Sequence, residues 1–309
     1  MRRTGILLCL ASAVAFGTMG IFGKLAYGDG ATVGTLLAVR FALAAALFWG
    51  LVAATGALAR VRELPRRDVA LAFGLGALGY SAQAGCFFVA LDRVDASLLS
   101  LLVYTYPALV TVAAIMLGRE RADRRIALAL ALASIGLVLV LAEAGPGTLD
   151  PLGVALGLAA ALIYTVYILT SEGISRRAGP IVLSAFVCTG AAVSLSIAGL
   201  LVGDLHPEAV SASGLAWLAA IAVISTVAAI GLFFAGLRRV GSTTASIVST
   251  AEPLTTVLLA FLVLGESLDA VQLLGGALVL SGVVVLSAAA PAPLALRARF
   301  TRRVRWQTR

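Results

Sequence analysis

The chain has 309 residues, of which 61% are hydrophobic and 12% are charged, and its formal net charge is +8. Water-soluble proteins are about 45–50% apolar and about 25% charged. This composition excludes a soluble fold, because too much apolar surface would face water. A basic chain is also typical of nucleic-acid binding, but here the arginines lie in short segments between long apolar runs. That pattern indicates orientation in a membrane rather than a phosphate-binding face.

Ten apolar runs follow one another along the chain. A helix needs about 20 apolar residues to cross a bilayer core of about 30 Å. The runs cover residues 5–26, 33–54, 69–91, 95–117, 124–142, 151–172, 180–202, 213–236, 243–264 and 270–289. They are too long for barrel strands, and their polarity does not alternate. We therefore predict an all-α integral membrane protein with ten transmembrane helices and short loops.

The placement of charge predicts how these helices are oriented. If the N-terminus is cytoplasmic, 20 of the 23 positive residues fall on the cytoplasmic side, and the other three are Lys24, Arg40 and Arg93. The segments on the opposite side carry mostly acidic residues. By the positive-inside rule, we expect a multi-pass protein of the inner (plasma) membrane with both termini in the cytoplasm.

The chain contains an internal repeat. Residues 87–138 align without a gap onto residues 233–284, at an offset of 146 positions, and 15 of the 52 aligned positions are identical. Shared apolar composition does not readily produce the matched polar and proline positions, which include Pro107/Pro253, Glu120/Glu266 and Asp123/Asp269. Glu120 and Glu266 are expected to have a structural role at helix ends.

Each repeat holds five predicted spans, so the two halves must cross the membrane in opposite senses. We predict that residues 1–147 and 148–290 form two inverted five-helix repeats, followed by an arginine-rich cytoplasmic tail at residues 291–309. Inverted repeats are typical of secondary transporters, because two related halves of opposite orientation can open a central site to either side in turn.

Motifs in both halves carry a resemblance to a known family. They are Ala15-Phe16-Gly17-Thr18, Val39-Arg40-Phe41, Pro107 with Gly118-Arg119-Glu120, and Glu252-Pro253 with Leu264-Gly265-Glu266. Over its whole length the chain resembles the EamA-type members of the drug/metabolite transporter superfamily. One departure is Phe16, because the family often has Trp before this glycine. The resemblance implies a non-enzymatic carrier, commonly an exporter of amino acids, metabolites or toxic compounds.

Glu252 is the residue that most strongly indicates a substrate site. It lies near the middle of the ninth predicted span, where a carboxylate costs roughly 2.5–3.5 kcal/mol and usually faces a wet cavity. Pro253 has no N–H for the carbonyl of Ser249, so we expect the helix to bend there, and Pro107 repeats the break in the other half. Paired interruptions of this kind indicate a site near the midplane. The alternative is a structural acid that caps the proline kink.

Other polar and aromatic residues recur at helical spacing and are predicted to line the same cavity. They are Ser249 and Thr256 in the ninth span, Ser100 and Tyr104 in the fourth, Tyr80 and Gln83 in the third, and Tyr164 and Tyr167 in the sixth. Each tyrosine has ordinary packing as its alternative role. Arg40 in the second span is predicted to line the cavity and attract an anionic group, with pairing to an acid or extension to the headgroups as alternatives. Together these residues predict a site for a small, partly apolar solute.

A membrane enzyme that acts on a lipid is the alternative from another class. The single histidine, His206, lies in a short loop, and the sequence has no H-E-x-x-H or G-x-S-x-G motif. The three cysteines share no metal-ligand spacing, and no phosphate-binding loop is present, so we expect no metal and no cofactor.

We therefore expect a secondary active transporter and not an enzyme. It would export a small metabolite, such as an amino acid or a drug-like solute, by alternating access. Glu252 would bind a proton or the cationic part of the substrate. The expected partners are the small-molecule substrate, the lipid bilayer and protons, with no nucleic acid. Uptake of a sugar or nucleoside is the second alternative, and the substrate, the coupling ion and the oligomeric state stay open.

Overall fold

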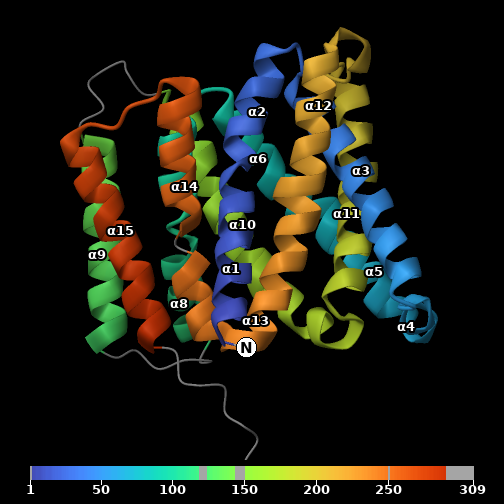
Figure 1. The fold of residues 1–309 in the computed structure, drawn as a ribbon, viewed down its shortest axis with the longest axis horizontal. Helices are drawn as coiled ribbons and strands as arrows, with labels where there is room; N and C mark the ends of the chain where they lie inside the picture. The colour runs from blue at the N-terminus through green and yellow to red at the C-terminus, as the bar shows by residue number, and fades with distance from the viewer. Residues whose placement is uncertain (1, 118–123, 143–149, 250, 290–309) are drawn as a thin grey trace, which may run out of the picture.

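The computed structural model describes residues 2–117, 124–142, 150–249 and 251–289. Every regular element within these ranges is a helix, and the long helices run side by side in one bundle (Figure 1). The all-α class predicted from the sequence agrees with this architecture. The predicted tail at 291–309 and the loop that contains Glu120 lie outside the described residues.

The first half of the bundle contains α1 (Arg2–Gly17), α2 (Met19–Gly28), α3 (Val33–Ala54), α4 (Leu58–Glu63), α5 (Arg66–Gly74), α6 (Ser81–Leu91), α7 (Ala96–Val103), α8 (Tyr106–Met116) and α9 (Arg124–Ala142). The second half contains α10 (Pro151–Ala178), α11 (Pro180–Val202), α12 (Ala212–Ala220), α13 (Ala229–Ser249), α14 (Ala251–Leu259) and α15 (Ala270–Ala289). Three π-helical segments, η1 (Leu75–Tyr80), η3 (Ile221–Ala228) and η4 (Ala260–Leu264), continue α-helices, and η2 (Pro207–Ala209) is a 3₁₀ turn.

Six helical segments are long and apolar enough to cross a membrane, judged by length and composition. They are Arg3–Gly28, Val33–Ala54, Arg66–Leu91, Pro151–Ser171, Pro180–Val202 and Ala212–Gly236. Four shorter apolar helices lie where the remaining predicted runs are: Ala96–Val110, Ile126–Val140, Ala251–Leu264 and Ala270–Val285. Several apolar segments of spanning length in one chain are those of a multi-pass membrane protein.

One predicted boundary is wrong. The sequence predicts a loop at residues 237–242 and a ninth span from residue 243, whereas α13 is helical up to Ser249. Residues 237–249 hold no proline and one glycine, so nothing in them stops the helix. The helix is described as far as Ser249, and Pro253, four positions further on, has no N–H to donate to the carbonyl of that residue.

Several spans are interrupted near their middles. The first passes from α1 to α2 at Thr18, and the fourth passes from α7 to α8 at Tyr104 and Thr105. The third and the eighth contain the π-helices η1 and η3. Breaks and π-bulges release backbone groups to other partners and are frequent at functional sites.

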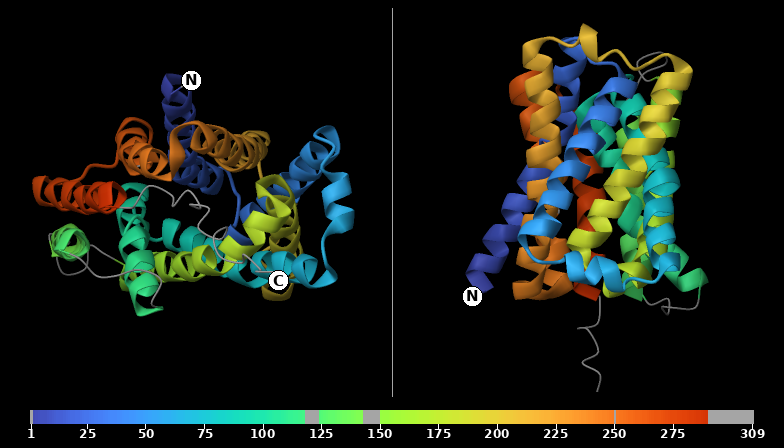
Figure 2. Two further views of the ribbon diagram at one scale, coloured as in Figure 1. Left: turned by 90° about the horizontal axis from the view of Figure 1, so that it is seen from below. Right: turned by 90° about the vertical axis from the view of Figure 1, so that its right-hand side faces the viewer.

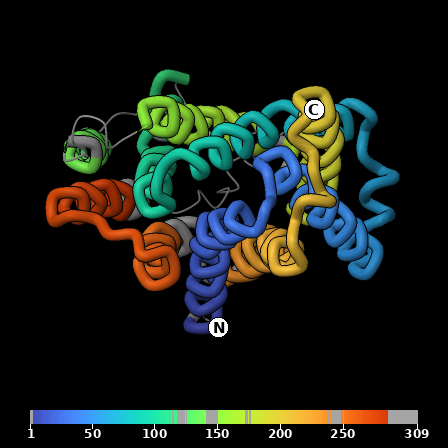
Figure 3. The backbone as a smooth tube through the Cα atoms, turned by 90° about the horizontal axis from the view of Figure 1, so that it is seen from above, coloured from blue at the N-terminus to red at the C-terminus, as the bar shows by residue number. Residues whose placement is uncertain are grey.

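Close glycine contacts fix the pairing of α9 with α15. Figure 3 shows the bundle end-on, with these two helices together at one edge and α3 and α4 at the opposite edge. A Cβ on Gly136 would lie 2.5 Å from the carbonyl oxygen of Gly275, and a Cβ on Gly275 would lie 2.6 Å from that of Gly136. Helices in lipid approach one another closely where small residues face each other.

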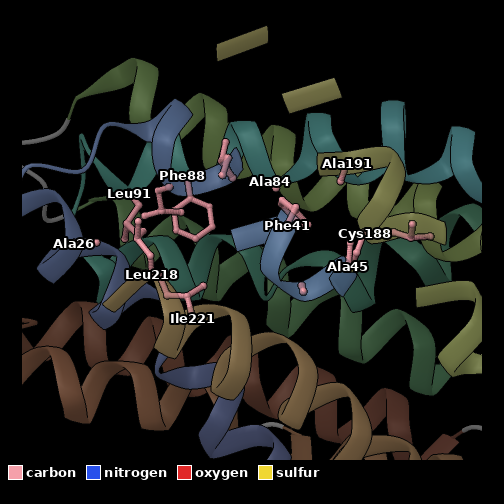
Figure 4. Packing of buried hydrophobic residues seen from close by; sticks show 14 of the residues in the cluster. Ala26, Phe41, Ala45, Ala84, Phe88, Leu91, Cys188, Ala191, Leu218 and Ile221 are labelled. Carbon is pink, nitrogen blue, oxygen red and sulfur yellow. The ribbon is translucent and has the colours of Figure 1, made fainter. Parts of the chain in front are cut away.

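A buried apolar core joins helices of the two halves (Figure 4). Phe41 on α3 and Phe88 on α6 are both 0% exposed, as are Leu218 on α12 and Ile221 on η3. Large side chains enclosed in this way hold their helices in a fixed register, because the packed interior leaves no room for repacking. The core therefore holds the second span, and with it Arg40, at a fixed position.

The two ends of the bundle are held by different polar contacts. The N-terminus and α4 lie at one end, and the connection between α11 and α12 lies at the other (Figures 1 and 2). At the end away from the N-terminus, Glu266 accepts hydrogen bonds from the backbone N–H of Ala96 at 3.0 Å and of Ser97 at 3.0 Å, and from the Ser97 hydroxyl at 2.9 Å. It thereby caps the start of α7, which confirms the structural role predicted for this glutamate.

Candidate functional site

Two adjoining cavities share part of their walls. The first, cavity A, has a volume of about 120 Å³, and the second, cavity B, has a volume of about 260 Å³. Both are lined by Phe16, Tyr80, Tyr106, Tyr164 and Glu252. These five side chains come from five different helical elements, α1, η1, α8, α10 and α14. The shared wall is therefore formed by residues that come together from five spans in both halves of the chain.

The two cavities extend toward opposite ends of the bundle. Cavity A reaches Ala96 at the start of α7, on the end capped by Glu266. Cavity B reaches Pro180 at the start of α11, where the chain comes from the end that carries the N-terminus. A solute that passed from one cavity to the other would have to pass the shared wall.

Each of the ten predicted cavity residues lines one of these cavities. Cavity A is lined by Arg40, Tyr80, Gln83, Ser100, Tyr104, Tyr164, Glu252 and Thr256, and cavity B by Tyr167 and Ser249 in addition to the shared residues. Pro107 lies in the first turn of α8, and Pro253 is the third residue of α14. This result is geometric, and the binding of a substrate at these residues stays a prediction.

Tyrosine rings make up much of the wall between the cavities. The ring centroids of Tyr104 and Tyr106 are 5.7 Å apart, those of Tyr106 and Tyr164 are 4.9 Å apart, and those of Tyr164 and Tyr167 are 6.1 Å apart. Tyr80 lies against Tyr167 at 5.4 Å. Edge-to-face and stacked pairs at these separations stabilise one another. The cluster gives the site flat apolar faces together with hydroxyl groups.

Glu252 lies in the first turn of α14, where the helix dipole favours a negative charge. Its side chain is half-buried and borders both cavities. Within the part of the chain that the structure describes, its carboxylate makes no hydrogen bond and no ion pair. A carboxylate without a protein partner at this depth is free to take a proton or a cationic group of a ligand.

The backbone next to Glu252 is supported from two other spans. The Tyr104 hydroxyl donates to the carbonyl oxygen of Ser249. The Thr256 hydroxyl donates to the carbonyl oxygen of Gly17 at 3.0 Å, where α1 ends. A Cβ on Gly17 would lie 2.8 Å from the carbonyl oxygen of Glu252, so this glycine lets the first span lie directly against the start of α14. Both contacts hold the interrupted backbones in place.

Arg40 is the cationic group of the site. Its side chain is 2% exposed, and its Nε donates to the Thr226 hydroxyl at 3.1 Å. The guanidinium carbon lies 4.9 Å from the ring centre of Phe41 and 5.3 Å from that of Phe88. The structure places this side chain inside the protein, so the alternative that it extends to the lipid headgroups is wrong. The cause is the two enclosed phenylalanine rings, which hold the charge over their faces.

Tyr106 is a residue of the shared wall that was not predicted from the sequence. In an unbroken helix it would point away from Tyr104, two positions earlier, but the turn between α7 and α8 brings both rings to the cavity. A signal was available, since Tyr106 aligns with Glu252 at the repeat offset of 146 and both residues precede a proline. Thr170, three positions after Tyr167 in the sixth span, is exposed, and its hydroxyl donates to the carbonyl oxygen of Val166 in the same helix.

The site combines charged, polar and aromatic groups. One carboxylate, one guanidinium and several phenolic hydroxyls surround two small cavities with aromatic walls. Among the residues that the structure describes, no group of three His, Cys, Asp or Glu side chains is placed to hold a metal ion.

The fold and the cavities between interrupted membrane helices are those of a membrane transporter. The profile of the EamA-like transporter family matches residues 3–142 and again residues 151–288. The chain therefore belongs to the EamA-like transporter family, as its sequence motifs predict.

Relatives and a solved structure agree with this assignment. An uncharacterized transporter of Archaeoglobus fulgidus is 27% identical over 283 residues, which cover 92% of this chain and 96% of that protein. The uncharacterized transporter YcbK of Bacillus subtilis is 28% identical over 284 residues and 88% of each chain. A crystal structure with 20% sequence identity has a TM-score of 0.65 and covers 93% of this chain and 98% of its own, which shows a shared fold. Both relatives are named as transporters, and their names give no substrate.

Proposed function

We propose that the protein is a secondary carrier that exports a small, partly apolar metabolite by alternating access. The observation that supports this most is Glu252, which has no hydrogen bond or ion pair within the described ranges and lies on the wall between two cavities that extend to opposite ends of the bundle. A carrier needs one site that can open to either side, and a residue common to both cavities has that position. Export as the direction rests on the family resemblance.

The proposal includes ten membrane crossings arranged as two inverted repeats, with both termini in the cytoplasm. Three structural matches at the offset of 146 support it. The π-helices η1 and η3 begin at Leu75 and Ile221, which are 146 positions apart. Tyr106 and Glu252 share the cavity wall at the same offset. At the same offset, Gly136 corresponds to Gly282 and Ala129 corresponds to Gly275. Gly136 lies close to Gly275, and in the corresponding pair a Cβ on Gly282 would lie 2.8 Å from the carbonyl oxygen of Ala129.

Glu252 is proposed as the group that couples transport to protons. The charged form of a carboxyl group is poorly solvated in a membrane interior, so proton binding and release there are sensitive to which side supplies water. The other titratable side chains that line the two cavities are those of Arg40, Tyr80, Tyr104, Tyr106, Tyr164 and Tyr167. A proton on Glu252 removes the one negative charge of the shared wall and thereby changes which solutes fit.

The experiment is transport by the purified full-length chain in proteoliposomes. The panel comprises amino acids, nucleosides, sugars and cationic drugs, each measured with and without a pH gradient. We expect saturable flux for one solute class and a change in that flux when the gradient is imposed. Absence of flux for every class in correctly inserted, folded protein contradicts the carrier, and flux that ignores the gradient contradicts proton coupling.

A further inference from the structure

We propose that Arg40 binds the carboxylate group of the transported solute, so that the substrates of this protein are small carboxylates. This inference rests on the proposed carrier function and assigns it a substrate class. It is carried by the surroundings of Arg40 in cavity A.

The guanidinium has donors that the protein does not use. It carries five N–H groups in a planar fork. Nε is bound to the Thr226 hydroxyl, and the Tyr80 hydroxyl also interacts with the group. No carboxylate of the described residues forms an ion pair with it. Among the described residues, every side-chain nitrogen that is shielded from solvent has a hydrogen-bond partner. The guanidinium nitrogens of Arg40 that have no partner are therefore not shielded, and they border the open space of cavity A.

The orientation of the fork is fixed in advance. The enclosed rings of Phe41 and Phe88 hold the guanidinium at 4.9 Å and 5.3 Å from their centres, and the Thr226 hydroxyl holds its inner edge. A guanidinium that is stacked and anchored in this way loses little further freedom when it binds a planar group with two oxygens. The geometry therefore suits a bidentate carboxylate.

The charges on the cavity wall favour a carboxylate over a phosphate. Among the described residues that line cavity A, Arg40 is the one with a positive charge and Glu252 the one with a carboxylate, and they are not paired with each other. A buried cation without a counter-charge is unfavourable, so a ligand that supplies one negative charge stabilises the site. A phosphate ester would bring about two charges near pH 7, and Glu252 would repel the second.

The test is equilibrium binding to the purified full-length chain by isothermal titration calorimetry, with matched probes. Glycine, leucine and phenylalanine are compared with their amides, glycinamide, leucinamide and phenylalaninamide, and with 3-phenylpropionate, which lacks the amine. We expect at least one carboxylate to bind. The matching amide should bind at least about tenfold more weakly, because the amide cannot form the charged pair. Equal binding of acid and amide, or no binding by any of the carboxylates, overturns the proposal.

Two variants locate the effect. Arg40→Lys keeps the charge but loses the fork, and we expect it to weaken binding of the tightest carboxylate about tenfold. Lys24→Gln removes a basic residue of the first predicted span that does not line cavity A, and it should leave binding unchanged. Unchanged binding by Arg40→Lys overturns the proposal. If that variant does not fold, the comparison of acid with amide on the wild-type chain still decides.

The outcomes separate this inference from the carrier function. Saturable proteoliposome flux of a cationic drug or a sugar that none of the carboxylates inhibits leaves the carrier standing and overturns the role of Arg40. Carboxylate binding that depends on Arg40, together with no flux of any solute, supports the site and contradicts the carrier.

Discussion

The hydroxyl of Tyr104 donates a hydrogen bond to the carbonyl oxygen of Ser249. This is the carbonyl that Pro253 leaves without its helical donor. Tyr104 follows the last residue of α7, and Ser249 lies three positions before Glu252, so this bond joins the break of the fourth span to the segment that precedes Glu252. Glu252 lies one turn further along, and its position therefore depends on this contact.

Replacing Tyr104 with Phe should lower the free energy of unfolding by about 1–2 kcal/mol, because the ring is almost fully enclosed and its hydroxyl is lost from a carbonyl in the protein interior. The melting temperature of the purified protein in detergent measures the effect. Tyr167→Phe is the matched control, since the Tyr167 hydroxyl makes no hydrogen bond among the described residues. Equal melting temperatures for the two variants would remove the Tyr104–Ser249 bond from the account.

Replacing Gly17 with Ala should destabilise the protein by about 1–3 kcal/mol, because the new methyl group would lie 2.8 Å from the Glu252 carbonyl oxygen and 2.8 Å from Cβ of Thr255. One of these neighbours is backbone and cannot rotate away. Gly28→Ala is the control, because nothing lies within 4 Å of a Cβ there, and it should stay within about 1 kcal/mol of wild type. If thermal unfolding shows the Gly17 variant to be as stable as the Gly28 variant, the close approach of α1 to α14 is not as described.

Glu266→Gln should cost about 1.5–3 kcal/mol, because the charged carboxylate accepts three hydrogen bonds at the start of α7 and the amide cannot accept them all. Asp269→Asn is the comparison. Asp269 accepts from the backbone N–H of Gln272 at 2.7 Å within its own helix start, so its loss is local and smaller. A larger fall in melting temperature for Asp269→Asn than for Glu266→Gln would contradict the bracing role of Glu266.

The stability of the connection between α11 and α12 should depend on pH. The hydrogen bond to Glu208, with a further one to the Gly203 carbonyl, raises the pKa of His206 above its ordinary value. A group whose pKa is raised by folding stabilises the folded state below its unfolded pKa of about 6.5, and the stabilisation is lost as pH rises through the folded pKa. We expect the melting temperature of wild type to fall, relative to His206→Gln, as the pH rises from below about 6.5 through the raised pKa of His206. Parallel curves for the two proteins would show that this contact does not contribute.

The sequence was sufficient for the class of fold and for most of the wall of the site. Long apolar runs have one physical explanation, which is burial in lipid, and a carboxylate within such a run must face something polar. Pro107 indicated a break in the fourth span, and the structure has a turn at Tyr104 and Thr105 just before it. These signals are local, and they led to Glu252, Tyr104 and Tyr164 without any knowledge of packing.

What the sequence did not predict depends on breaks and on contacts between distant segments. No proline in the sequence indicates the interruption at Thr18. The hydroxyl of Thr256, from the other half, donates to the carbonyl oxygen of Gly17 beside it. Tyr106 reaches the cavity only because the turn before it changes the helical register. The guanidinium of Arg40 contacts Phe88 and Thr226, which are 48 and 186 positions away in the sequence. Spacing within one helix carries no record of such neighbours.

The most direct test of the central claim is proton-driven flux in proteoliposomes that hold either the wild-type chain or Glu252→Gln. The account predicts saturable, gradient-dependent flux for wild type, and loss of that flux, or of its dependence on the gradient, for a variant whose melting temperature shows that it is folded. Wild-type flux with unchanged proton dependence in Glu252→Gln would contradict the account.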